Sequence, residues 1–253
     1  MNLGEKNEYL LKFALILLRD SGNTKIKDVG FGNESYGSLP VDFKLQNLHL
    51  LNEQQQIKSL AASVGISKAP SSAKSDVYVD GMGYSVKYAN AAPPAIVNHT
   101  HRHGILKVCN KLGLNISAID AMVDQYWKLR NVGIIAEDVS NSSSNSPFRI
   151  KDPNLVKLVE YFIFEGTASS RSNYPAQMVL EFTDPANLET WFLYDRSQII
   201  DHIWDKLVFS IRSKGMPKSY DHGGMGSRDL QIQKWTHYKD GKYKGALHIR
   251  IKQ

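Results

Sequence analysis

An aspartate, a serine and a lysine stand at alternate positions around a short turn in the segment DVYVDGMGYSVKY. Apolar and polar residues alternate on both sides of Gly81 and Met82, which predicts two antiparallel strands joined by a two-residue turn with glycine first. That register puts Asp76 opposite Lys87. Because cross-strand partners share a face of the sheet, we expect Asp76, Ser85 and Lys87 to converge on one side of the hairpin.

Two kinds of role fit this polar face. A solvated Asp–Lys pair would stabilise the hairpin by roughly 0–1 kcal/mol and have no further role. Alternatively, the Asp76 carboxylate binds a hard divalent cation through oxygen. Lys87 would then orient or activate an attacking water and stabilise the charge that builds on a phosphate. This second interpretation is a metal-dependent phosphodiesterase, in which Ser85 contributes a hydroxyl or holds a metal-bound water.

The elements around the hairpin predict a mixed fold. Helical periodicity covers residues 5–20, 52–66, 101–112, 116–131, 153–162 and 196–206. Strand patterns cover residues 177–182, 189–195, 206–212, 229–235 and 246–252. The serine-rich stretch Ser140–Pro147 indicates a flexible loop or a boundary. We therefore expect an α/β (mixed α+β) protein with a boundary near residues 140–150.

Composition narrows the class of protein only mildly. The chain has 253 residues, of which 42% are hydrophobic, enough for one or two packed units. Its formal charge of +6 favours polyanionic partners weakly. The single cysteine, Cys109, excludes an intrachain disulfide and indicates a reducing compartment, so we expect a cytoplasmic protein. The apolar run Tyr9–Leu18 contains Lys12 and has no cleavage-site pattern, which predicts a buried helix rather than a membrane span or a signal peptide.

Three separated segments together resemble a known family. Ser75-Asp76, a turn and the triplet Ser85-Val86-Lys87 resemble the active-site core of the PD-(D/E)XK nuclease superfamily. More closely, they resemble the small type II restriction endonucleases that cut short CG-containing sites, several of which have a neutral residue where Ser85 stands. The segment GEKNEYLLKF resembles their first helix and places Glu8 at the position of a glutamate that faces the site. The segment LQIQKWTHYKDGKYKGALHIRIK resembles their last hairpin, which reaches the DNA.

This resemblance implies a fold and an activity. The fold would be a PD-(D/E)XK core over residues 1–140, a central mixed sheet flanked by helices, with a sheet-rich DNA-recognition subdomain over 150–253 packed on it. The activity would be Mg²⁺-dependent, site-specific hydrolysis of double-stranded DNA by a monomer or homodimer. Asp76 and Glu8 would hold the metal, Lys87 would be the catalytic lysine, and Ser85 would occupy the degenerate acid position. A DNA methyltransferase for the same site would be the functional partner. The alternatives are a structure-specific DNA repair nuclease and a catalytically inactive DNA-binding protein.

A polar and basic stretch follows the hairpin and is a candidate for DNA contact. Asn98, His99, Thr100, His101 and Arg102 carry donors near an expected helix start, where phosphates and base edges bind well. Three alternatives remain open. The histidines of this stretch could form part of a zinc site, one of them could be the general base of another class of metal nuclease, or the stretch could be a solvated loop.

The second half of the chain offers further candidates for DNA contact. Ser170 and Arg171 lie in a polar connection between an expected helix and strand, which could equally be an ordinary loop. The glycine-rich stretch 212–229 is long enough to be an arm that engages DNA, or a disordered loop. The side chains expected to contact base edges are Arg228, Gln233 and Lys234, and those expected to contact phosphates include Lys244.

Overall fold

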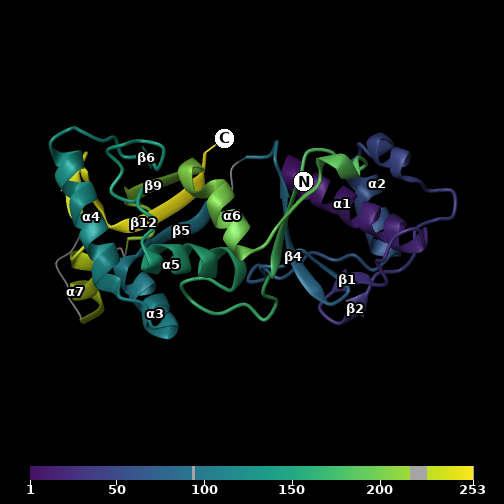
Figure 1. Cartoon of the computed structure of the whole chain (residues 1–253), viewed down its shortest axis with the longest axis horizontal. Helices are drawn as coiled ribbons and strands as arrows, with labels where there is room; N and C mark the ends of the chain where they lie inside the picture. Colours follow the sequence, from purple (N-terminus) through teal and green to yellow (C-terminus); the bar gives the residue numbers. More distant parts are fainter. Residues whose placement is uncertain (93–94, 217–226, 253) are drawn as a thin grey trace. The chain divides into compact units, whose positions relative to one another are not determined.

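The chain is a mixed α+β protein that packs as two units. The computed structural model describes residues 1–92, 95–216 and 227–252 (Figure 1). The first unit comprises residues 1–92, 164–166 and 171–199, and the second comprises 93–163, 167–170 and 200–253. The boundary expected at 140–150 therefore lies inside the second unit. Residues 95–101 belong to the second unit because they form a strand that pairs with residues 246–250, near the end of the chain.

A six-stranded mixed sheet forms the centre of the first unit, in the order β2-β1-β3-β4-β7-β8. Strands β4 and β7 are parallel, and the other neighbours are antiparallel. The strands are β1 (Val29–Phe31), β2 (Glu34–Ser35), β3 (Val77–Val79), β4 (Met82–Tyr88), β7 (Met178–Phe182) and β8 (Phe192–Tyr194).

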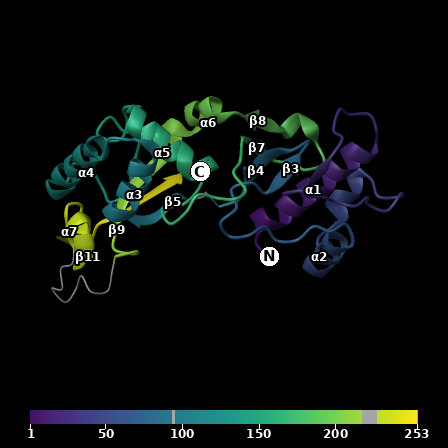
Figure 2. The same ribbon diagram turned by 90° about the horizontal axis from the view of Figure 1, so that it is seen from below.

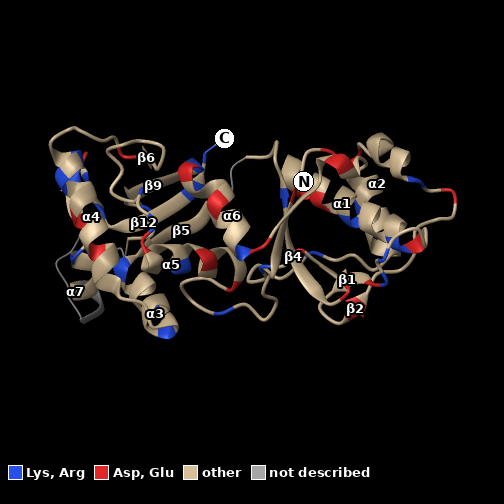
Figure 3. Cartoon of the chain, viewed as in Figure 1, with Lys and Arg blue, Asp and Glu red and all other residues tan. Residues whose placement is uncertain are grey.

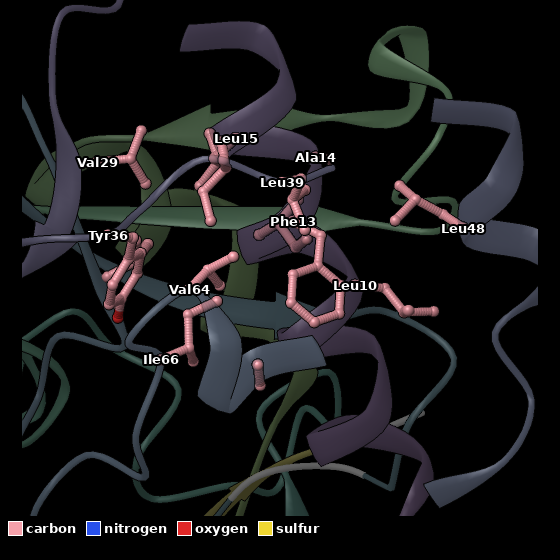
Figure 4. Close-up of a cluster of buried hydrophobic side chains, with 14 of the residues drawn as sticks. Leu10, Phe13, Ala14, Leu15, Val29, Tyr36, Leu39, Leu48, Val64 and Ile66 are labelled. Atoms are coloured by element: carbon pink, nitrogen blue, oxygen red, sulfur yellow. The ribbon is translucent and has the colours of Figure 1, made fainter. Parts of the chain in front are cut away.

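Helix α1 (Leu3–Asp20) packs against this sheet and beside α2 (Gln54–Ser63), as Figure 1 shows. The Asn2 side chain caps α1 by accepting from the Glu5 amide at 2.8 Å. Short 3₁₀ helices, η1 (Leu45–Leu50) and η2 (Leu188–Thr190), complete the unit. Figure 4 shows part of the core, where apolar side chains of α1 meet others from the sheet and from the segments around α2. Residues 10–16 of α1 are all buried, so the middle of this helix is covered on every side, as expected of an apolar helix in the core.

The hairpin forms, but its turn and register differ from the prediction. Asp80 and Gly81 are the two turn residues, with φ of 50° and 79°. Positive φ at both central positions is the type I′ turn that Asp-Gly favours. Val77 therefore pairs with Tyr84, and by continuation Asp76 lies opposite Ser85 rather than Lys87. The shift is two positions, so the faces of the two strands are unchanged.

The second unit is built on a four-stranded sheet in the order β5-β12-β9-β6. Its strands are β5 (Ala95–His101), β6 (Val139–Ser140), β9 (Leu207–Arg212) and β12 (Ala246–Ile251), and a separate hairpin joins β10 (His237–Lys239) to β11 (Lys242–Lys244). The helices are α3 (Arg102–Leu112), α4 (Ile116–Asn131), α5 (Pro153–Phe164), α6 (Arg196–Ile203), η3 (Trp204–Lys206) and α7 (Ser227–Gln233). The last residue of α5 and residues 196–199 of α6 belong to the first unit. Figure 2 shows α3 beside β5.

Residues 229–235, expected to be a strand, instead contribute to helix α7 and the turn after it. Ile232 and Trp235 are fully buried, and their spacing of three residues is that of a helical face. Trp235 accepts a hydrogen bond from the Trp127 indole at 2.9 Å through its carbonyl, which ties this segment to α4. Within the described ranges, every helix is too short or too polar to cross a bilayer.

Candidate active site

Asp76 is held at the start of β3 with one carboxylate oxygen fixed. Its amide donates to the Tyr84 carbonyl at 2.8 Å. Its Oδ2 accepts from the Val86 amide at 2.7 Å and, at the longer distance of 3.5 Å, from the Ser85 hydroxyl. In the part of the chain that the structure describes, Oδ1 accepts no hydrogen bond. The carboxylate is therefore oriented by the protein and keeps an oxygen for a ligand.

Close packing at the base of the hairpin supports this position. The buried Ser75 hydroxyl donates to the Pro175 carbonyl at 2.7 Å, and the Gly83 amide donates to Gln177 Oε1 at 2.6 Å. A side chain at Gly83 would come within 2.2 Å of Ser75 Oγ, so this approach requires glycine. The connection before β7 therefore anchors the residues on both sides of Asp76.

Lys87 lies next to this carboxylate, as the alternation predicted. Its Nζ is 3.8 Å from Asp76 Oδ2 and donates to the Val86 carbonyl at 3.1 Å. The Lys87 side chain is 39% exposed and that of Asp76 24%, so the pair is open to a ligand from solvent. Ser85 shares the face but is 4% exposed. Its hydroxyl contacts Asp76, which makes it a support for the carboxylate.

Glu8 reaches the same region from α1. Its carboxylate accepts from Lys12 Nζ at 2.7 Å, one helical turn further along. Burial raises the pKa of the Glu8 carboxyl; Lys12 opposes this rise, and the negative charge of Asp76 adds to it. The charges of Asp76 and Lys87 both influence the Glu8 carboxyl, but its direct partner is Lys12, so Glu8 stays a predicted member of the site.

Four residues near this cluster were not predicted. Lys12 is 1% exposed and could have been found from its i+4 spacing to Glu8. Burial and the charge of Lys87 lower the pKa of Lys74 to about 8, although Asp76 opposes the shift. Glu181 on β7 lies beside Lys87 in the parallel register, and burial together with the charges of Glu8 and Asp76 raises the pKa of Tyr36, which follows β2. Only tertiary pairing brings Glu181 to the site.

The oxygen atoms of this cluster fit a magnesium ion better than a metal that needs many protein ligands. Among the described residues, no group of three or more histidine, cysteine, aspartate or glutamate side chains is placed to hold a metal ion. Mg²⁺ is usually bound by one or two carboxylates together with water and substrate phosphate. Asp76 offers one carboxylate oxygen of this kind, and Glu8, which Lys12 holds in this structure, is the second candidate ligand.

The polar stretch after the hairpin forms strand β5 rather than a loop. Asn98 is exposed, whereas His99 and Thr100 are half-buried. The His99 ring lies 4.4 Å from that of His248, and His99 has a positive φ of 51°. His101 caps α3 by accepting from the Gly104 amide at 3.3 Å. Asn98, His99 and Thr100 remain candidates for DNA contact, while His101 has a structural role at the start of a helix.

Arg102 is a structural residue, contrary to its predicted role in DNA contact. It is 3% exposed, and its guanidinium donates to both carboxylate oxygens of Asp120, at 2.8 and 2.7 Å. A further bond joins it to Gln231 of α7. Asp120 also accepts from the Trp235 indole at 2.7 Å. The Arg102 guanidinium at the start of α3 therefore links α4, through Asp120, to α7, through Gln231.

Lys244 is also committed to intramolecular contacts. It is 7% exposed and forms ion pairs with Glu137 and with Asp240, the latter at 2.8 Å. Figure 3 shows the acidic and basic residues interspersed along the chain rather than gathered in separate blocks. Lys244 is thus a buried member of an ion-pair network, not a free contact for phosphate.

The other DNA candidates differ in how they are placed. Arg171 is exposed but forms an ion pair with Glu165, and exposed Ser170 accepts from the Thr167 amide at 2.9 Å. Gln233 and Lys234 are exposed at the end of α7 and beyond it. The Arg228 side chain and residues 217–226 of the glycine-rich stretch lie outside the described residues.

Comparisons of the chain with protein-family models, with curated proteins and with solved structures found no match.

Proposed function

We propose that the protein is a Mg²⁺-dependent, site-specific DNA endonuclease of the type II restriction class, with a PD-(D/E)XK-like core in its first unit. The observation that carries this proposal is the Asp76–Lys87 pair on the β3–β4 hairpin, whose carboxylate oxygen and ammonium nitrogen lie 3.8 Å apart. The parallel pairing of β4 with β7 gives this hairpin a place in a mixed sheet, which is the arrangement that the family resemblance implies.

Each residue of the cluster has a role in the proposed reaction. Asp76 and Glu8 would hold the ion, Asp76 through the oxygen that is not fixed by Val86. When bound, Mg²⁺ supplies Lewis-acid stabilisation of the phosphate and favours ionisation of a bound water. Lys87 orients the attacking water and stabilises negative charge that develops on the phosphate. Ser85 orients Asp76 rather than supplying a second acidic ligand.

DNA recognition is assigned to the second unit in this proposal. Asn98, His99 and Thr100 on β5 and exposed Gln233 and Lys234 after α7 have side chains suited to phosphate oxygens or base edges. The net charge of +6 favours a polyanion as substrate. A methyltransferase that protects the same site, a cytoplasmic location and action as a monomer or homodimer all follow from the restriction role.

Plasmid digestion tests the proposal directly. The full-length protein is incubated with supercoiled plasmid in Mg²⁺ and, as a control, in EDTA, and run-off sequencing locates the cut ends. Discrete Mg²⁺-dependent fragments with a shared end sequence are the expected result. Cutting of branched or damaged DNA alone would instead identify a structure-specific repair nuclease. Binding without cutting would identify an inactive DNA-binding protein.

A further inference from the structure

The β10–β11 hairpin of the second unit is fixed to that unit through one of its faces. His237 and Lys244 are cross-strand partners, so their side chains share this face, which we call the inner face. The His237 ring stacks on the Trp127 ring of α4, with centroids 4.5 Å apart and planes inclined by 17°. Buried Lys244 forms an ion pair with Glu137. The backbone of the hairpin is therefore held in place from its inner face.

The outer face of the same hairpin carries an exposed aromatic pair. Tyr238 and Tyr243 are also cross-strand partners, and the alternation of a strand places them on the side opposite His237 and Lys244. Their ring centroids lie 5.1 Å apart with planes at 65°, and the two residues are 65% and 39% exposed. Neighbouring apolar groups that a folded protein leaves exposed typically mark a site of interaction. Two open rings on a fixed hairpin are a contact surface of this kind.

The charges beside this pair favour an anionic partner. Lys239 and Lys242 are the next cross-strand partners toward the turn, and neither forms an ion pair with another residue that the structure describes. Lys242 is exposed. Asp240, the acidic residue of the turn, is already paired with Lys244 at 2.8 Å and with Arg130 at 3.0 Å. An anion that reaches this end of the hairpin therefore meets two lysines as well as the two rings.

Aromatic rings together with cations are the means by which proteins bind single-stranded nucleic acids. Bases stack on the rings, and a positively charged surface follows the phosphates between them. In a duplex the base faces are covered by their neighbours in the stack, so only an unpaired strand offers them to Tyr238 and Tyr243. An acidic peptide would use the lysines alone and leave the rings without a matched partner.

We propose that the outer face of the β10–β11 hairpin binds a single-stranded segment of DNA, with Tyr238 and Tyr243 stacked on its bases and the lysines near the turn close to its phosphates. This inference rests on the proposed function, because it takes the substrate of that function, DNA, as the partner. Stacking on an aromatic ring tolerates any sequence, since every base has a π-face. The hairpin therefore distinguishes an unpaired strand from a duplex and does not read the sequence.

The test compares two strands of equal length and charge, a short oligothymidine and the same backbone with abasic positions throughout. Each carries a fluorescein label and is titrated with the full-length protein in EDTA, where no cleavage occurs. The wild-type protein should bind oligothymidine about tenfold more tightly, because stacking on an aromatic ring contributes roughly that factor for each base. Tyr238→Leu should remove most of this preference, and Tyr238→Phe, which keeps the ring, should retain it. Tyr243→Leu serves as a second variant.

Two further variants separate stacking from charge and from general effects. Lys242→Gln should weaken binding to both strands alike and lower the slope of log affinity against log salt by about 0.7, the value for one phosphate contact with a single strand. Phe192→Leu is the matched control, since Phe192 is a 51% exposed aromatic residue on β8 of the first unit. It should keep the full preference for oligothymidine.

The outcomes separate this inference from the proposed function. Equal binding of the two strands by the wild-type protein overturns the inference, and Mg²⁺-dependent plasmid cleavage by the same preparation would leave the proposed function standing. If the protein neither binds DNA nor cuts it, both fail. A preference that depends on the rings, found without cleavage, supports the inference and counts against a nuclease. If Tyr238→Leu and Tyr243→Leu lower only the unfolding temperature and keep the preference, the pair merely stabilises the hairpin and the inference is wrong.

Discussion

Replacing Arg102 by methionine should destabilise the second unit rather than weaken DNA contact. The guanidinium is 3% exposed and makes three hydrogen bonds to Asp120 and Gln231. Removing one partner of a buried ion pair costs about 3–5 kcal/mol, because the remaining charge stays buried without compensation. The side chain of Asp120 is 23% exposed and keeps the hydrogen bond from Trp235, which favours the lower end of that range.

The expected change is large enough to measure by thermal unfolding. A loss of about 3 kcal/mol corresponds to a fall of roughly 6–12 °C in Tm for a chain of this size, taking about 2–4 °C per kcal/mol. Tryptophan fluorescence should report the same change, since Trp235 shares Asp120 with Arg102. The double variant Arg102→Met with Asp120→Asn should recover part of the loss, because it removes the uncompensated charge.

Lys107→Met is the matched control, since Lys107 is an exposed cation on the same helix. Its effect should stay within about 0.5 kcal/mol, as for most surface substitutions. The reasoning is refuted if Arg102→Met unfolds like the wild type and instead loses affinity for DNA with a shallower salt dependence. That outcome would return Arg102 to the DNA interface.

Two further predictions follow from ion pairs. Lys244→Met should lower the free energy of unfolding by about 1–3 kcal/mol, because it removes two charge-assisted hydrogen bonds. Lys242 is exposed, so Lys242→Met should leave the free energy of unfolding unchanged. Equal effects of the two substitutions in urea titrations would contradict this prediction. Burial raises the pKa of Glu165, but hydrogen bonds and charges from Arg196 and Arg171 outweigh it and lower the pKa below its usual 4.5. The folded state then binds fewer protons than the unfolded state, so this stabilisation is present above pH 4.5 and is lost as the pH falls through the lowered value. Glu165→Gln should therefore flatten the acid side of the stability profile, and a profile of unchanged slope would show that the pair contributes nothing.

Local sequence patterns predicted most of the helices and the face of the hairpin. Periodicity of 3.6 residues was sufficient for α4, because it buries one side, and the long apolar run was sufficient for α1, whose residues 10–16 are all buried. The hairpin turn was wrong, although Asp-Gly was a visible type I′ signal one position before the turn that was predicted. The error did not move Asp76 or Lys87 to another face, because a shift of two positions preserves the alternation.

Features that depend on distant pairing were not predictable in this way. The segment DLQIQKW fits an alternating strand, but burial of Ile232 and Trp235 selects a helix. Strand β5 was missed because its partner, β12, lies about 150 residues later in the chain (compare 95–101 with 246–251). Arg102 was assigned to solvent because its acidic partner comes from another helix. A cation that is exposed and one that is buried in an ion pair have the same local sequence signal.

The most direct test of the proposed nuclease site is the Mg²⁺-dependent rate of plasmid cleavage by Lys87→Met, with DNA affinity measured on the same preparation. The control is Lys58→Met, which removes an exposed cation from α2. Lys87 lies 3.8 Å from the Asp76 carboxylate, so its removal should slow cleavage by about 10²-fold or more while leaving affinity close to that of the wild type. Lys58→Met should cleave normally. Cleavage by Lys87→Met at the wild-type rate would contradict the assignment of the active site.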